Sequence, residues 1–172
     1  HNTGRRQRQM CIRDRHNLAN TAYNDRVEEC NYALKLINEK YGNKFSSLCE
    51  LDLNIIESFK NDMDVKIYNR ASFVINENLR THDAAIKLNE FKLMEIGNLM
   101  YQSHAGLKDL YEVSCNELDY LVDLTKAHDQ IIGSRMMGGG FGGCTINLIH
   151  KRFIDEFTEE ASKSYYLSLI HI

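Results

Sequence analysis

The sequence has 172 residues, of which 43% are hydrophobic and 26% charged, and its formal net charge is −3. These values are typical of one globular domain, and no apolar run approaches the ~20 residues that a transmembrane helix needs. The small negative charge gives no electrostatic attraction to nucleic acid or to an anionic membrane, so neither is an expected partner.

The cysteines are five in number, stand far apart and include no Cys-x-x-Cys pair. An odd, scattered set argues against a disulfide framework and against a zinc site, and fits the reducing cytoplasm. Proline is absent, whereas an average usage of about 5% would give roughly eight or nine. A helix-rich chain with few rigid turns is therefore expected. The cysteines are Cys11, Cys30, Cys49, Cys115 and Cys144.

The two ends of the chain differ from its body. Residues 1–15 hold five of the ten arginines against one acidic residue, Asp14, and show no helical or strand period. The runs QRQMCIRDR (7–15) and LSLIHI (167–172) resemble translated sequencing-adapter read-through, so we expect two non-native tails around a body at 16–166. The alternative for the first segment is a basic arm that binds an anionic partner.

The first helix of the body is predicted from an apolar stripe that starts at Tyr23 and continues at steps of 4, 3, 4 and 3 to Ile37. Gly42 is a plausible stop signal for it. Ser47 and Glu50 form a capping-box pattern that predicts a second helix.

Three more helices are predicted before the chain changes character. One covers about Asp64 to Leu88, and Asn89 is expected to cap the next. Ser114 and Glu117 form another capping-box pattern, which predicts a further helix. The apolar face of the fourth helix carries Leu93, Ile96, Met100 and His104.

A glycine-rich segment, GSRMMGGGFGGCTINLIH (133–150), separates these helices from the last part of the chain. The alternation after Gly143 predicts a strand, residues 131–136 are a candidate second strand, and a closing helix follows with Phe153 and Phe157 on one side. This order predicts an α+β fold with helices packed on an antiparallel sheet. Two strands do not make an independently stable sheet, so the sheet is expected to be incomplete.

The glycine cluster 138–143 formally matches the dinucleotide-binding fingerprint, but that fingerprint needs a helix after the loop, and here a strand is predicted. No Gly-Lys-Ser/Thr sequence is present, so the loop is not a Walker A motif. Two alternatives stay open. The loop is either a hairpin connection, or a segment whose bare backbone packs against a phosphate-bearing loop or a substrate.

Four blocks of the sequence resemble galactokinases, which belong to the GHMP kinase family. GSRMMGGGFGGCT looks like the third conserved motif of these kinases, and Met137 stands where many members carry a hydroxyl residue. The other three blocks occur in the same order as in the family and cover, with the first, most of 16–150. They are LANTAYNDRVEEC (18–30), SFVINENLRTHDAA (72–85) and SHAGLKDLYEVSCNELDYLV (103–122).

The resemblance implies an ATP- and Mg²⁺-dependent sugar kinase that phosphorylates the C1 hydroxyl of α-D-galactose, and a ferredoxin-like sheet in its C-terminal domain. In that family the sugar-binding motif, the phosphate loop and the catalytic Asp lie upstream of the matching segment. We therefore expect a C-terminal piece of a galactokinase, incomplete at both ends. It would carry no catalytic residue, no metal ligand and no activity alone, and the full-length protein is expected to be monomeric and cytoplasmic.

Two sites in the chain match functional positions of the family. Tyr23 matches a tyrosine whose hydroxyl contacts the sugar, although the apolar stripe also allows a place in the core. Arg135 is expected to form a structural ion pair rather than to bind phosphate. The active-site glycine loop is matched by Gly138, Gly139, Gly140, Phe141, Gly142 and Gly143, which are expected to shape the pocket.

Other candidate residues have structural interpretations. Ser103, His104 and Asp109 would be a hydrolytic triad only if they met in space, and a hydrogen-bonded structural role is the default for His104. Cys144 is expected to be a small buried apolar residue. Asn76, Glu77, Asn78 and Arg80 are interpreted as a solvated or domain-facing surface, and His82, His128 and His150 show no metal-ligand spacing.

Two other functions remain as alternatives to the galactokinase interpretation. One is a kinase for N-acetylgalactosamine or another sugar. The other is a non-catalytic relative that senses galactose and ATP and signals through a protein partner. The residues that discriminate between the three lie upstream in the family.

Overall fold

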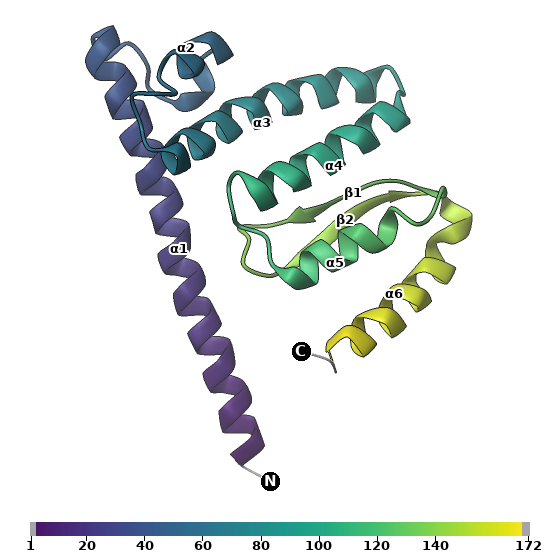
Figure 1. Ribbon diagram of the computed structural model, residues 1–172. Coiled ribbons are helices and arrows are strands. Elements are labelled where there is room, and N and C mark those ends of the chain that lie inside the picture. Colours follow the sequence, from purple (N-terminus) through teal and green to yellow (C-terminus); the bar gives the residue numbers. More distant parts are fainter. Residues whose placement is uncertain (1–2, 170–172) are drawn as a thin grey trace. The chain divides into compact units, whose positions relative to one another are not determined.

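The computed structural model describes the backbone of residues 3–169 and the side chains of residues 22–165. The chain divides into two compact units, His1–Ile75 and Asn76–Ile172 (Figure 1). The predicted α+β fold is confirmed. The helices are α1 (Thr3–Tyr41), α2 (Leu53–Ser58), α3 (Val65–Asn89), α4 (Leu93–Asp109), α5 (Asn116–Thr125) and α6 (Ile154–Leu169), and the strands are β1 (Ile131–Met137) and β2 (Cys144–Ile149).

Helix α1 begins at Thr3, much earlier than the apolar stripe predicts, and includes the backbone of the basic segment 3–15. Arg and Gln favour helix and no proline interrupts them, which explains a helix without an apolar face. The side chains of residues 1–21 lie outside the described part of the chain, as do residues 170–172 of the second predicted tail. The assignment of both tails as non-native stays a prediction.

The predicted stop of α1 is confirmed. Gly42 has a φ of 71°, and the Asn43 amide donates to the Asn38 carbonyl at 3.0 Å, which closes the helix in the way that a glycine after the last turn permits. Beyond this turn the unit His1–Ile75 has its own apolar core. Its buried members are Ala33, Ile37, Leu48, Leu51, Ile56, Phe59, Met63, Ala71 and Ile75.

The capping box at Ser47 and Glu50 is wrong as a helix start. Ser47 caps only a single 3₁₀ turn, and the Glu50 carboxylate accepts the Ser46 amide at 3.0 Å instead of the Ser47 amide. The chain becomes extended again, and α2 starts after Asp52, whose Oδ1 accepts the amides of Asn54 and Ile55 at 2.8 and 3.0 Å. The aspartate is the stronger cap because it satisfies two amides.

The other two predicted caps are also displaced. Asn89 is the last residue of α3, and α4 follows Lys92, which makes no side-chain cap. Ser114 donates to the Asp119 carboxylate at 2.5 Å, and Cys115 takes the position before α5. In each case the helix exists as predicted, but its first turn is set by the connecting segment.

The second unit contains a hairpin of β1 and β2, paired antiparallel from Ile131–Ile149 to Met137–Cys144 with an irregularity before Gly133. Both predicted strands are confirmed, and among the described residues the sheet has only these two. The closing helix is confirmed as well, because Phe153 and Phe157 are buried in a cluster with Ile131.

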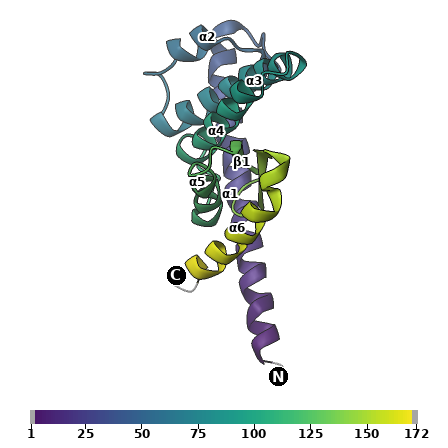
Figure 2. The same ribbon diagram turned by 90° about the vertical axis from the view of Figure 1, so that its right-hand side faces the viewer.

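Helix α4 runs beside β1, as Figures 1 and 2 both show, and the two meet through glycines. A Cβ atom on Gly97 of α4 would lie 2.0 Å from the Ile132 carbonyl oxygen, and one on Gly133 of β1 would lie 2.4 Å from the Gly97 Cα. No side chain fits between the two backbones. The sequence analysis did not single out either glycine.

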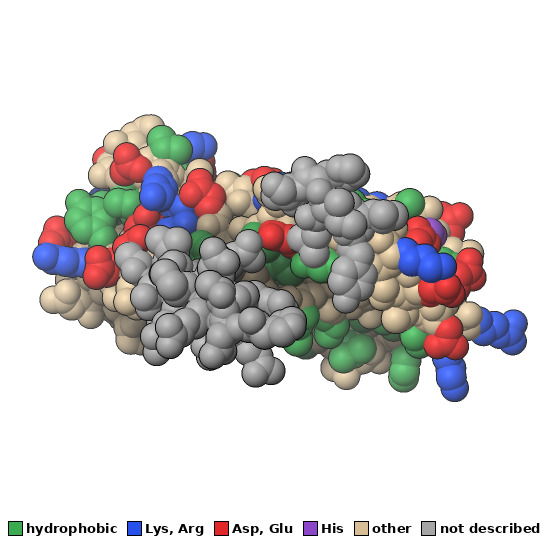
Figure 3. Space-filling view, turned by 90° about the horizontal axis from the view of Figure 1, so that it is seen from below, with side chains coloured by type: hydrophobic (Ala, Val, Ile, Leu, Met, Phe, Trp, Pro, Cys, Tyr) green, Lys and Arg blue, Asp and Glu red, His purple; other side chains and the backbone are tan. Residues whose placement is uncertain are grey.

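The surface seen in Figure 3 carries acidic and basic side chains interspersed among polar ones, and neither sign forms a continuous field there. Apolar side chains are also exposed, among them Phe91 at the turn between α3 and α4. Within the described residues, no helix is long and apolar enough to cross a membrane.

The Gly97 contact predicts a destabilised Gly97→Ala variant. Overpacking costs about 1–3 kcal/mol, and a Cβ only 2.0 Å from a backbone oxygen places Gly97→Ala at the upper end. The helix preference of Ala offsets about 1 kcal/mol, so we expect a net loss of about 2 kcal/mol in the free energy of unfolding. Urea unfolding followed by circular dichroism measures this. The matched control is Gly139→Ala, where a Cβ meets open space without positive φ, with an expected change below about 0.5 kcal/mol. A Gly97→Ala variant as stable as the parent would contradict the contact.

Candidate active-site loop

The glycine loop 138–143 joins β1 to β2, so a strand follows it and the dinucleotide-binding alternative is excluded by the structure. Five of its six residues have positive φ, including the non-glycine Phe141 at 60°. Glycine is required most strictly at Gly140, where φ is 92° and a Cβ would lie 2.5 Å from the Val113 carbonyl oxygen.

The middle of the loop is fixed to the connection between α4 and α5. The Phe141 amide donates to the Val113 carbonyl at 2.7 Å, and the Phe141 ring packs against a buried cluster of Val113, Leu118 and Met136. This anchoring offsets the cost of a left-handed backbone at a residue with a side chain, which is of order 1–3 kcal/mol.

The rest of the loop is open. Cβ atoms on Gly138, Gly139 or Gly142 would meet nothing within 4 Å. Among the described residues, Phe141 is the one member of the loop whose amide donates to a backbone carbonyl outside the strand ladder. Bare glycine backbone of this kind lets a ligand approach closely and offers N–H groups to it.

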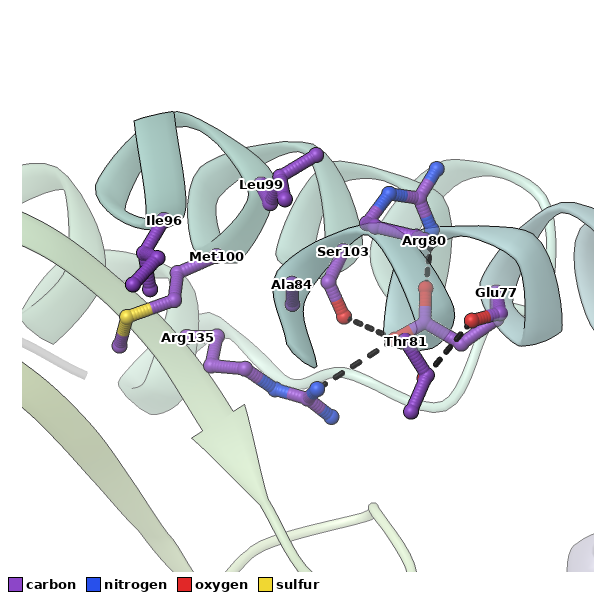
Figure 4. Close-up of a pocket in the computed structure, with 9 residues that line it drawn as sticks. All are labelled: Glu77, Arg80, Thr81, Ala84, Ile96, Leu99, Met100, Ser103 and Arg135. Atoms are coloured by element: carbon purple, nitrogen blue, oxygen red, sulfur yellow. Dashed lines mark hydrogen bonds and ion pairs between the residues drawn. The ribbon is translucent and has the colours of Figure 1, made fainter. Parts of the chain in front are cut away.

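Beside the loop's first strand lies a pocket of about 70 Å³ between α3, α4 and β1. Figure 4 shows the Arg135 guanidinium reaching from β1 toward the Glu77 carboxylate of α3, with Nη1 and Oε1 3.3 Å apart. The ion pair expected for Arg135 is confirmed. The pocket is lined by Glu77, Arg80, Thr81, Ala84, Ile96, Leu99, Met100, Ser103 and Arg135.

Glu77 and Arg80 were expected on a solvated or domain-facing surface, and their low exposure excludes only the solvated alternative. The Glu77 side chain is 22% exposed. Its carboxylate binds Arg80 and Arg135 and accepts the Ser103 hydroxyl at 2.5 Å. The sequence signal was available but indirect. Arg135 stands between the buried Ser134 and Met136, and a charge inside a strand calls for a partner.

His104 has the structural role that was expected. Its Nδ1 accepts the Met136 amide at 3.3 Å, so the ring proton lies on Nε2, 3.3 Å from an Asp119 oxygen. Burial lowers the pKa of His104, and the Asp119 carboxylate opposes this only in part. The histidine is therefore neutral near pH 7, so its contact with Asp119 is not a full ion pair there.

The possible hydrolytic triad is not assembled. Ser103 donates to Glu77, and the carboxylate beside His104 belongs to Asp119 and not to Asp109. No nucleophile therefore faces the histidine, and Asp119 is a partner that the sequence analysis missed.

Tyr23 lies on α1 in the unit His1–Ile75 with 55% of its surface exposed, so in that unit it is not a core residue. The glycine loop lies in the other unit. The apolar stripe becomes fully buried only at its last member, Ile37, whereas Val27 is exposed and Leu34 is half-buried.

Cys144 contradicts its expected burial, because it is exposed at the start of β2. Its neighbours Met137 and Ile146 are also exposed, so this end of the hairpin has no apolar cover among the described residues. The isolated sheet of two strands explains the difference.

The side chains described at 22–165 include no group of three or more His, Cys, Asp or Glu that could hold a metal ion. Glu77, the acid nearest the loop's first strand in this network, is already engaged by two guanidinium groups. This set of donors therefore does not fit Mg²⁺.

Known proteins are similar to this chain in sequence and in fold. Residues 84–167 match the family described as GHMP kinases C terminal. The galactokinase of Clostridium tetani is 43% identical over 157 residues, which are 91% of this chain and 40% of that protein. Residues 84–167 of this chain therefore form a GHMP kinase C-terminal domain. Bacillus subtilis galactokinase is 38% identical over 149 residues, which are 86% of this chain and 38% of that protein.

A solved galactokinase structure agrees with this family match. The crystal structure of Lactococcus lactis galactokinase complexed with galactose matches with a TM-score of 0.79 and 32% identity, covering 86% of this chain and 38% of that one. The chain thus spans about two fifths of the length of the curated galactokinases named above.

The lowered pKa of His104 predicts that stability falls with acidification. The unfolded histidine takes up a proton near pH 6.5, whereas the folded one resists it, so stability is lost as the pH falls below that value toward the lowered pKa. Urea unfolding between pH 8 and 5.5 should show a steeper loss in the parent than in His104→Gln, by at most about 1.4 kcal/mol per pH unit. The other histidines are common to both proteins, and parallel profiles would contradict the assignment.

Proposed function

We propose that this chain is the C-terminal part of a galactokinase, an enzyme that transfers the γ-phosphoryl group of ATP to the C1 hydroxyl of α-D-galactose. The observation that carries the proposal is the glycine loop, fixed at Phe141 and open on both sides, in a chain similar to galactokinases over nine tenths of its length. The reaction is the first step of galactose breakdown.

The loop's proposed task is to shape the site. Phosphoryl transfer depends mostly on positioning and charge stabilisation. A rigid loop of bare backbone would therefore help to position the reacting groups. Gly140 lies against Val113, which fixes the loop, while Gly138, Gly139 and Gly142 leave room for the reacting groups.

Tyr23 is proposed as a sugar contact. An exposed phenol can donate a hydrogen bond to a ring hydroxyl and cover a face of the pyranose. The family places the catalytic Asp, the phosphate loop and the main sugar motif upstream, so this chain supplies walls and contacts rather than the base. Mg²⁺ would be bound by that other part.

Two alternatives share the same chain chemistry. A kinase for N-acetylgalactosamine or another sugar would use the same loop, and so would a non-catalytic relative that senses galactose. Galactose phosphorylation is favoured because the relatives named above are galactokinases, one of them solved with galactose. The odd, scattered set of five cysteines fits a cytoplasmic protein, and we expect a monomer.

Galactose-dependent ADP formation by the intact protein that contains this chain tests the proposal. We expect turnover with galactose well above that with N-acetylgalactosamine, and none from the 172-residue chain alone. The Gly140→Val variant of the intact protein should lose activity, because the valine side chain cannot fit beside Val113. Tight galactose binding without ADP formation would favour the sensing alternative, and an active chain of 172 residues would mean that the base lies within it.

The Tyr23 proposal predicts a sugar-specific defect. In the intact protein, Tyr23→Phe removes one hydrogen bond worth about 1 kcal/mol, so the KM for galactose should rise about fivefold and the KM for ATP less. Tyr32→Phe is the matched control, since Tyr32 is an exposed tyrosine of the same helix with 52% of its surface accessible. A larger effect on the KM for ATP would refute the sugar contact.

A further inference from the structure

Glu77 lies on α3, outside the glycine loop. Arg135 stands three residues before Gly138, and its side chain contacts the backbone of the next residue in its own strand. Its Nε donates to the Met136 carbonyl at 3.0 Å, and its Nη1 reaches Glu77 at 3.3 Å (Figure 4). Glu77 therefore holds the backbone that leads into the loop through one side chain.

The Glu77 carboxylate also collects the other elements around this point. Oε1 accepts Ser103 of α4 and Arg135 of β1, and Oε2 pairs with Arg80 of α3. The carboxylate and both guanidinium groups are partly buried, so their attraction is screened less than on an open surface. One carboxylate thus links α3 and α4 to the end of β1 that precedes the loop.

The loop itself has few other restraints. Its centre is held at Phe141, its ends are held by the Met137–Cys144 pair of the ladder, and three of its glycines face open space. Glycine has the largest conformational freedom to lose, so the position of the first half, 138–140, depends on where β1 ends.

We propose that Glu77 is a positioning residue for the glycine loop, acting through Arg135. The proposal rests on the proposed kinase function for its effect on turnover, but its effect on the loop can be measured without any activity. If Glu77 only holds α3 against the sheet, its substitution would speed amide exchange throughout the unit. A positioning residue loosens the loop and the end of β1 selectively.

Amide hydrogen exchange by NMR on the full 172-residue chain separates the two. In Glu77→Gln, which keeps the shape and removes the charge, we expect the Phe141 amide to exchange at least about tenfold faster, with the buried Val122 of α5 unchanged. Glu95→Gln is the matched control, because it removes an exposed carboxylate that pairs with Lys87 at 2.8 Å on the same helix pair. That variant should match the parent.

In the intact protein, Glu77→Gln should lower kcat for galactose phosphorylation about tenfold per folded molecule, with the KM for galactose within threefold, and Glu95→Gln should leave both unchanged. If Glu77→Gln does not fold, Ser103→Ala removes one donor from the same carboxylate and should accelerate Phe141 exchange by a smaller factor.

Equal acceleration at Phe141 and Val122, or no acceleration in a folded variant, would overturn the proposal. If the parent protein phosphorylates no galactose, the proposed function fails, and the exchange measurement alone decides the role of Glu77.

Discussion

The direct contact of two backbones, Gly97 of α4 and Gly133 of β1, is the constraint on which the second unit depends. Since no Cβ fits at either position, the helix lies as close to the strand as the main chains allow. The same helix then brings Ser103 and His104 to the far end of β1. There one side chain completes the Glu77 cluster and the other accepts the Met136 amide. A wider spacing would leave both contacts unmade.

The close approach also explains the polar chemistry beside the loop. His104 accepts the Met136 amide of β1 at one ring nitrogen, and the Asp119 carboxylate lies beside the other. Among the described residues, no buried polar side-chain atom lacks a partner. The region before the glycine loop is therefore a connected network in which neutral histidine, hydroxyl and ion pairs each have a definite role, as expected for polar groups away from water.

Much of this could be predicted from the sequence, and the failures have a common cause. The helices, both strands, the stop at Gly42 and the ion pair of Arg135 follow from periodicity and local chemistry. The helix starts at Ser47 and Ser114 were wrong because capping patterns compete with neighbouring residues that only the folded turn selects. The Gly97 contact, the partners of Glu77 and the exposure of Cys144 depend on segments distant in sequence, which no local pattern reveals.

The anchoring of Phe141 has a consequence for how the loop can vary in length. The ladder fixes Met137 and Cys144 opposite each other, and the Val113 contact fixes the middle, so each half of the loop is a short span between two fixed points. An inserted residue in either half would have to displace Phe141 or shift β2 by one position. A shift by one would turn every side chain of β2 to the opposite face of the sheet. Among sequences that keep this anchor, the length of the six-residue loop should therefore vary less than the residue types within it.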